Sequence, residues 1–192
     1  MPLAIAMVVW MMGNAGPPPA RDLVRDPDRI DFHVRGTDPL TRAWIAHGAE
    51  ESRTLRDLLQ ALTASDIIVH VQLVDRIPGG ASGQLSFVTA TATARYLRAE
   101  IVRGASRADT IALIAHELQH ATEVAAAPRV RDAESLSTLY LGMRDNAGDS
   151  RRYDSAAARM TESLVRREVI AHRVQPDGEM ELLAELKRPA RN

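Results

Sequence analysis

The chain has 192 residues, with 24 basic and 25 acidic side chains that give a formal net charge of -1 at pH 7. No basic block interleaves with aromatic residues, so nothing indicates binding to nucleic acid or to an anionic membrane surface. The absence of cysteine excludes disulfides and thiolate ligands, which leaves histidine and carboxylate side chains as the strong metal donors.

The N-terminal segment has the pattern of a secretion signal. Residues 3–12 form an apolar run that is too short to span a bilayer but typical of a signal-peptide core, and small residues follow at Gly13 and Ala15. Because no basic residue precedes the run, a buried helix or an uncleaved anchor stays open as an alternative. We expect residues 1–20 to be a signal peptide and proline spacer, and residues 21–192 to be a single exported domain, periplasmic or secreted, with no stable membrane span.

The next part of the chain predicts an irregular lead-in followed by two helices. Residues 21–39 show no clear hydrophobic period, and His33 within them is expected to be exposed. Residues 40–47 and 51–63 are expected to be helical. In the second helix, four leucines at i, i+3, i+4 and i+7 predict a face that packs in the core: Leu55, Leu58, Leu59 and Leu62.

Three β-strands are predicted after these helices, at residues 67–74, 84–90 and 95–102. The first segment is rich in β-branched residues and is bounded by turn residues. In the third segment apolar residues alternate with charged residues. We expect the three segments to form a small antiparallel sheet. His70, in the first strand, is expected to be a packed or edge residue and not a metal ligand.

The segment after this sheet carries the strongest functional signal. Ser106 and Asp109 indicate a helix start, an apolar repeat follows, and Pro128 ends the predicted helix. On such a helix His116 and His120 lie on the same face one turn apart, so their imidazoles can bind one ion. Glu117 is rotated by about 100°, where it can reach a metal-bound water as a general base. Solvated histidines, or a metal site kept only for structure, remain alternatives.

The remainder of the chain is expected to be mainly helical. Residues 132–143 and 155–172 predict two helices, separated by a loop at Gly148 and Asp149. A turn is expected at residues 176–178, followed by a short amphipathic piece. Two tyrosines, Tyr140 and Tyr153, are candidates to stabilise an oxyanion, although a buried structural tyrosine is the commoner case.

The His116-Glu117-Leu118-Gln119-His120 sequence resembles the active-site helix of the zincin metallopeptidases, and the chain is similar to a family of uncharacterised exported bacterial proteins with the same motif. In that family a later Tyr-Glu-Thr-like segment follows, which here reads Tyr153-Asp154-Ser155. The resemblance implies an α+β fold in which a small sheet lies on the active-site helix and further helices follow. It also implies that an edge strand can pair with an extended peptide.

Four carboxylates compete to be the third metal ligand: Glu123, Glu134, Asp154 and Glu162. Glu123 lies about 7 to 8 Å further along the helix axis than the expected position of the metal ion. This distance favours a contact that orients His120 over direct binding to the ion. Glu134 opens the following helix, where the helix dipole already stabilises a carboxylate, and Glu162 lies among arginines, as in a solvated ion pair. Asp154 matches the acidic position of the family, with aspartate in place of glutamate, and is the predicted ligand; Glu123 and Glu134 are the second-shell or alternative residues.

These observations predict a zinc-dependent hydrolase, a peptidase acting on peptide or protein substrates, with Zn2+ held by His116, His120 and Asp154 and with Glu117 as the base. The first alternative is a non-catalytic envelope or metal-binding protein that retains the same helix. The second is a structural interaction domain without a metal.

Overall fold

The structure is a computed structural model that describes residues 33–142 and 154–186, with side chains up to residue 172. The expected signal peptide and spacer, the loop at Gly148 and Asp149, and Tyr153 lie outside these residues.

Four strands form one mixed sheet in the order β1-β2-β4-β3. These are β1 (Val34–Gly36), β2 (Ile67–Val74), β3 (Gly83–Ala90) and β4 (Arg95–Val102). The β1/β2 and β2/β4 pairs are parallel, and only the β3/β4 pair is antiparallel. The three strands expected from the sequence are therefore confirmed, together with an α+β fold, but the expectation of an antiparallel sheet was wrong.

The reason for the mixed sheet is the position of β4. Its inward-facing Leu97, Ala99 and Ile101 are completely buried, whereas β3 has one buried residue, Leu85. A strand with a continuous apolar face gains most from a central position, so β4 lies beside β2 and β3 takes the edge. The chain reaches that edge through Pro78–Gly80, where two glycines adopt positive φ angles.

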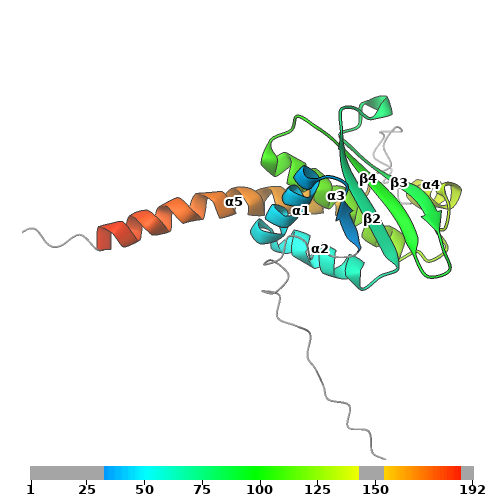
Figure 1. The fold of residues 1–192 in the computed structure, drawn as a ribbon, viewed down its shortest axis with the longest axis horizontal. Helices are drawn as coiled ribbons and strands as arrows, with labels where there is room; N and C mark the ends of the chain where they lie inside the picture. Colours follow the sequence, from blue (N-terminus) through cyan, green and yellow to red (C-terminus); the bar gives the residue numbers. More distant parts are fainter. Residues whose placement is uncertain (1–32, 143–153, 187–192) are drawn as a thin grey trace, which may run out of the picture.

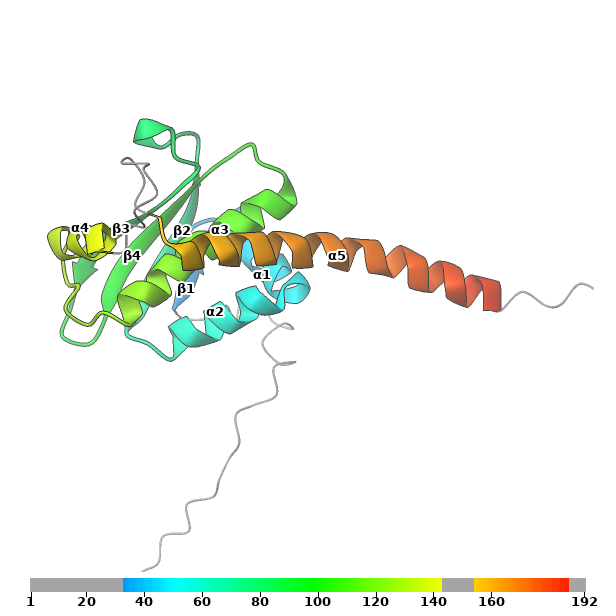
Figure 2. The ribbon, with the colours of Figure 1, turned by 180° about the vertical axis from the view of Figure 1, so that it is seen from behind.

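Five α-helices in the described residues complete the fold: α1 (Pro39–Glu51), α2 (Arg53–Thr63), α3 (Arg107–Ala125), α4 (Ala133–Gly142) and α5 (Ala156–Leu186). The leucine face predicted for α2 is buried as expected. In Figure 1 the sheet lies in front of α3, and in Figure 2, from behind, α5 lies in front of α3. Helix α3 is thus enclosed between the sheet and α5. No helix in the described ranges is long and apolar enough to cross a membrane.

Two expectations near the ends of the described residues were wrong. The lead-in contains β1, whose Val34 is fully buried, and His33 is half-buried with its Nδ1 2.8 Å from the carbonyl oxygen of Ile67. A three-residue strand shows no period in the sequence, which is why it was missed. The turn expected at residues 176–178 is absent because α5 runs through them; helix-forming residues on both sides outweigh the local turn preference. Its C-terminal half projects from the body of the protein (Figure 1).

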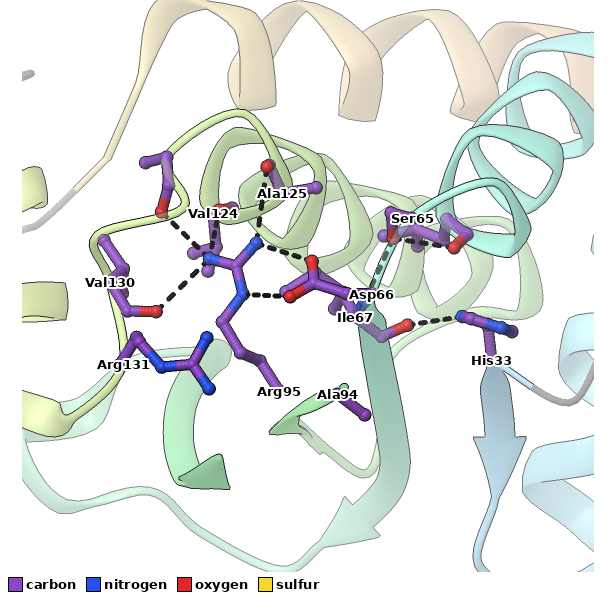
Figure 3. Close-up of polar contacts among 12 residues, drawn as sticks. His33, Ser65, Asp66, Ile67, Ala94, Arg95, Val124, Ala125, Val130 and Arg131 are labelled. Carbon is purple, nitrogen blue, oxygen red and sulfur yellow. Dashed lines mark hydrogen bonds and ion pairs between the residues drawn. The ribbon is translucent and has the colours of Figure 1, made fainter. Parts of the chain in front are cut away.

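Arg95, the first residue of β4, joins the sheet to the end of α3 (Figure 3). Its side chain is only 1% exposed and forms two hydrogen bonds with the carboxylate of Asp66, at 2.7 and 2.8 Å. The same guanidinium donates to carbonyl oxygens at and just beyond the C-terminus of α3, including those of Val124 and Ala127 at 2.8 and 2.9 Å. Each of these two carbonyls also accepts a backbone N–H, from Ala127 and Val130 respectively, and a cation at this end of the helix opposes the helix dipole.

Candidate metal centre

Helix α3 forms as its sequence predicts. The side chain of Ser106 accepts a hydrogen bond from the backbone N–H of Asp109 and donates to the carboxylate of that residue at 2.6 Å. The apolar repeat of Ile111, Ile114 and Leu118 is completely buried. The helix ends at Ala125, ahead of the proline. The His-Glu-x-x-His motif therefore lies in the middle of a capped and well-packed helix.

The two histidines of the motif converge, and Asp154 joins them. The rings of His116 and His120 have their centroids 4.9 Å apart. Asp154, which precedes α5 in the chain, places Oδ1 3.4 Å from Nε2 of His116. One ligand atom from each of the three residues lies within 4.8 Å of the others. The three side chains predicted as metal ligands are thus brought together in space.

A carboxylate is bound to the Nδ1 atom of each histidine. Glu123 lies 2.8 Å from Nδ1 of His120, and Glu162 lies 3.0 Å from Nδ1 of His116. An ionised carboxylate can only accept, so Nδ1–H donates in both pairs, and in the neutral form of each imidazole Nε2 has the free lone pair. This arrangement is typical of metal-binding histidines.

The expected orienting contact of Glu123 is present, whereas Glu162 lies elsewhere than the sequence suggested. It was expected in a solvated ion pair with an arginine. It does pair with Arg166, at 2.6 Å, but its other oxygen faces His116 and its side chain is only 22% exposed. The packing of α5 on α3 turns this position towards the histidine, and no signal in the sequence of α5 alone could have shown it.

The electrostatics of the two imidazoles differ because their surroundings differ. Burial lowers the pKa of His116, and the neighbouring His120 adds to this effect. Burial would also lower the pKa of His120, but the hydrogen bond with Glu123 and the charge of Glu117 outweigh it and raise the pKa. For Glu123, burial acts to raise the pKa, and the hydrogen bonds from His120 and Ser155 outweigh it and lower the pKa.

Glu117 lies in a different environment from the other carboxylates. It is only 3% exposed, and burial raises its pKa to about 7. Its Oε2 atom is buried and has no hydrogen-bond partner among the described residues. The backbone of β3 at Gly83 lies against its Oε1 atom. A carboxyl group with a pKa near neutrality can accept and return a proton at physiological pH.

Other residues considered from the sequence lie around this cluster or away from it. Tyr140 of α4 is buried, and its ring stands edge-on to His120 with centroids 5.1 Å apart; burial raises the pKa of its hydroxyl. Glu134 is exposed in the first turn of α4 and is not in the cluster. His70 alternates with the buried residues of β2 and is half-buried on the opposite face of the strand, as expected for a packed residue.

The donor set could hold a metal ion such as zinc. Tetrahedral bonds of about 2.0 to 2.1 Å to nitrogen and oxygen place neighbouring ligand atoms roughly 3.4 Å apart; His116 Nε2 and Asp154 Oδ1 are 3.4 Å apart, and all three ligand atoms lie within 4.8 Å of one another. That oxygen is buried and makes no hydrogen bond with the described residues, and the same holds for Oε2 of Glu117. Buried carboxylate oxygens of this kind are costly unless a cation or a donor meets them.

The chain was compared with protein-family models, with curated proteins and with solved structures, and no match was found.

Proposed function

We propose that this chain is an exported zinc-dependent hydrolase that cleaves peptide bonds. The observation that carries the proposal is the convergence of His116, His120 and Asp154 beside the buried carboxyl group of Glu117. Two neutral imidazoles and one carboxylate are a common ligand set of catalytic zinc sites, which keep a fourth position for water or substrate.

The residues of the chain have distinct roles in this proposal. His116, His120 and Asp154 hold the ion, which, when bound, polarises the substrate carbonyl and lowers the pKa of water. Glu117 accepts a proton from the attacking water on its carboxylate and returns it to the leaving amine. Its raised pKa supports both steps, because a base with a pKa near the working pH gives up the proton as readily as it takes it.

Access for a substrate is supported by the exposed side of the cluster. The side chains of His116 and Asp154 are 13% and 24% exposed, whereas that of His120 is 4% exposed. The edge strand β3 begins against Glu117 and pairs with one strand only among the described residues. An extended peptide added to this edge would pass beside the proposed base.

A second candidate is a non-catalytic metal-binding protein. The deep burial of His120 and Glu117 favours it, because structural metal sites are closed to solvent. In this case the same three ligands hold the ion, but no substrate is turned over.

Two measurements test these proposals. Protein purified without added zinc is expected to contain one zinc per chain, which is lost in His116→Ala and in His120→Ala. The Glu117→Gln variant is expected to keep the zinc but to lose hydrolysis of a broad peptide library by about 10²- to 10⁴-fold, since an amide cannot accept the proton. A zinc-loaded wild type that cleaves no peptide would favour the non-catalytic candidate, and a metal-free wild type would refute both.

A further inference from the structure

Both carboxylates that orient the histidines are held in place by donors on the segment that forms α5. Ser155, which also caps this helix through the N–H of Ala158, donates to Glu123 at 2.5 Å. Arg166 donates to Glu162 at 2.6 Å. Each imidazole is therefore hydrogen-bonded to a carboxylate, and that carboxylate accepts a second hydrogen bond from a side chain of the α5 segment.

The second of these chains extends further than the first. The Nε atom of Arg166 donates to Asp109 at 2.7 Å, while its terminal nitrogen holds Glu162. Asp109 is itself bound to Ser106, the residue that caps α3. The guanidinium thus joins the start of α3 to the carboxylate that faces His116, without being a member of the metal-binding cluster.

The hydrogen bond from Arg166 restricts the conformations of the Glu162 side chain. Glutamate has several rotatable bonds, and the side chain of Glu162 is partly exposed, so a single contact to His116 would compete with solvated conformers. Arg166 is held at two points by its planar group, which restricts the position of Glu162 Oε1. The other oxygen of the same carboxylate is then directed at Nδ1 of His116.

We propose that Arg166 is a positioning residue of the metal centre, which acts through Glu162 on the ring of His116. The inference rests on the proposed metal site and adds a residue that the motif itself does not contain. Loss of an outer-shell partner typically weakens metal binding by 10- to 100-fold. Because Arg166 acts through one intermediate, we expect the lower end of this range, about 10-fold.

The test is zinc affinity of the full chain, prepared metal-free and measured by competition with a chelator. Arg166→Met is expected to weaken zinc binding about 10-fold, and Arg166→Lys, which keeps the charge but not the two-point contact, is expected to have an intermediate effect. The matched control is Arg167→Met, at the next and exposed position of α5, which is expected to bind zinc as the wild type does.

A double variant distinguishes positioning from general stabilisation of the helix pair. If Arg166 acts through Glu162, then Arg166→Met combined with Glu162→Gln binds zinc no more weakly than Glu162→Gln alone. The thermal unfolding of every metal-free variant shows whether the fold is intact. If Arg166→Met does not fold, Arg166→Lys and its combination with Glu162→Gln carry the same comparison.

A second measurement, NMR of the His116 ring nitrogens, tests the same role of Arg166 in the metal-free protein. The ring ¹⁵N signals of His116 in the metal-free protein are expected to show a proton held on Nδ1 in the wild type, and a mixture of tautomers in Arg166→Met. Unchanged zinc affinity and ring signals in Arg166→Met, or additive losses in the double variant, would overturn the inference while leaving the metal site intact. A wild type that binds no zinc would overturn both this inference and the proposed function.

Discussion

Gly83, the first residue of β3, lies directly against the carboxylate of Glu117: a Cβ atom at Gly83 would come within 2.4 Å of Oε1 and 3.2 Å of Cδ. Real Cβ atoms do not approach other atoms at the first of these distances. Only glycine therefore allows the proposed base to keep its position beside the edge strand. The relationship links one backbone position in the sheet to one functional group on the helix.

The Gly83→Ala variant is expected to lose peptide hydrolysis while keeping its zinc. The added methyl group must displace the Glu117 carboxylate, and a shift of about 1 Å in a catalytic group can cost roughly 10²-fold in rate. Steady-state kinetics together with metal analysis checks this. Gly142→Ala is the matched control, because a Cβ atom there meets nothing within 4 Å. Full activity in Gly83→Ala would show that the observed position of Glu117 is not required.

The choice of third ligand predicts different effects for two acidic residues. Asp154→Ala is expected to weaken zinc binding strongly, because a site with three protein ligands loses much of its affinity when one of them is removed. Glu134→Ala, an exposed position in α4, is expected to leave zinc affinity unchanged. Chelator competition on both variants measures the difference. Equal affinities would remove Asp154 from the ligand set.

Arg95 is expected to contribute strongly to stability. Arg95→Met removes a buried cation, so that Asp66 loses its two hydrogen bonds from the guanidinium and carbonyl oxygens at the end of α3 each lose one of their donors. The free energy of unfolding should fall by about 3 kcal/mol, as measured by urea denaturation of the metal-free protein. Arg98→Met, at an exposed position of the same strand, is the control. A change below about 1 kcal/mol in Arg95→Met would contradict this role.

The ion pair of Arg95 with Asp66 also predicts that the free energy of unfolding depends on pH. The hydrogen bond from Arg95 lowers the pKa of Asp66 below its ordinary value of 3.8. The unfolded chain therefore binds a proton at a higher pH than the folded chain, so this contribution to stability is present above about pH 4 and is lost as the pH falls further. Urea denaturation should show wild type more stable than Asp66→Asn at pH 6, with the difference narrowing towards pH 2. A difference that stays constant would exclude the linkage.

The proposed export of the protein can be tested independently of the metal centre. If residues 1–20 contain a cleaved signal, N-terminal sequencing of the protein from its native host should find a mature chain that begins at Gly16 or close to it. Soluble cytoplasmic protein with an intact Met1 would refute the proposal.

The sequence by itself determined the features that depend on neighbours within one or two helical turns. The apolar repeat and the cap of α3 predicted its helix, and the four-residue spacing predicted that His116 and His120 share a face. The rise per residue was enough to place Glu123 at His120. Strand β2 was likewise predicted from its β-branched residues and the turn residues that bound it, and β4 from its alternation of apolar and charged residues. In each case the informative interaction is local, so the local pattern encodes it.

Only the tertiary structure decided which distant segments meet. The contact of His116 with Glu162 spans 46 residues, and that of Asp109 with Arg166 spans 57. Gly83 reaches Glu117 because β3 takes the sheet edge, a placement set by the stronger apolar face of β4. Such contacts depend on the packing of whole elements, in which buried area on all sides decides the arrangement, and no periodicity along the chain records that choice.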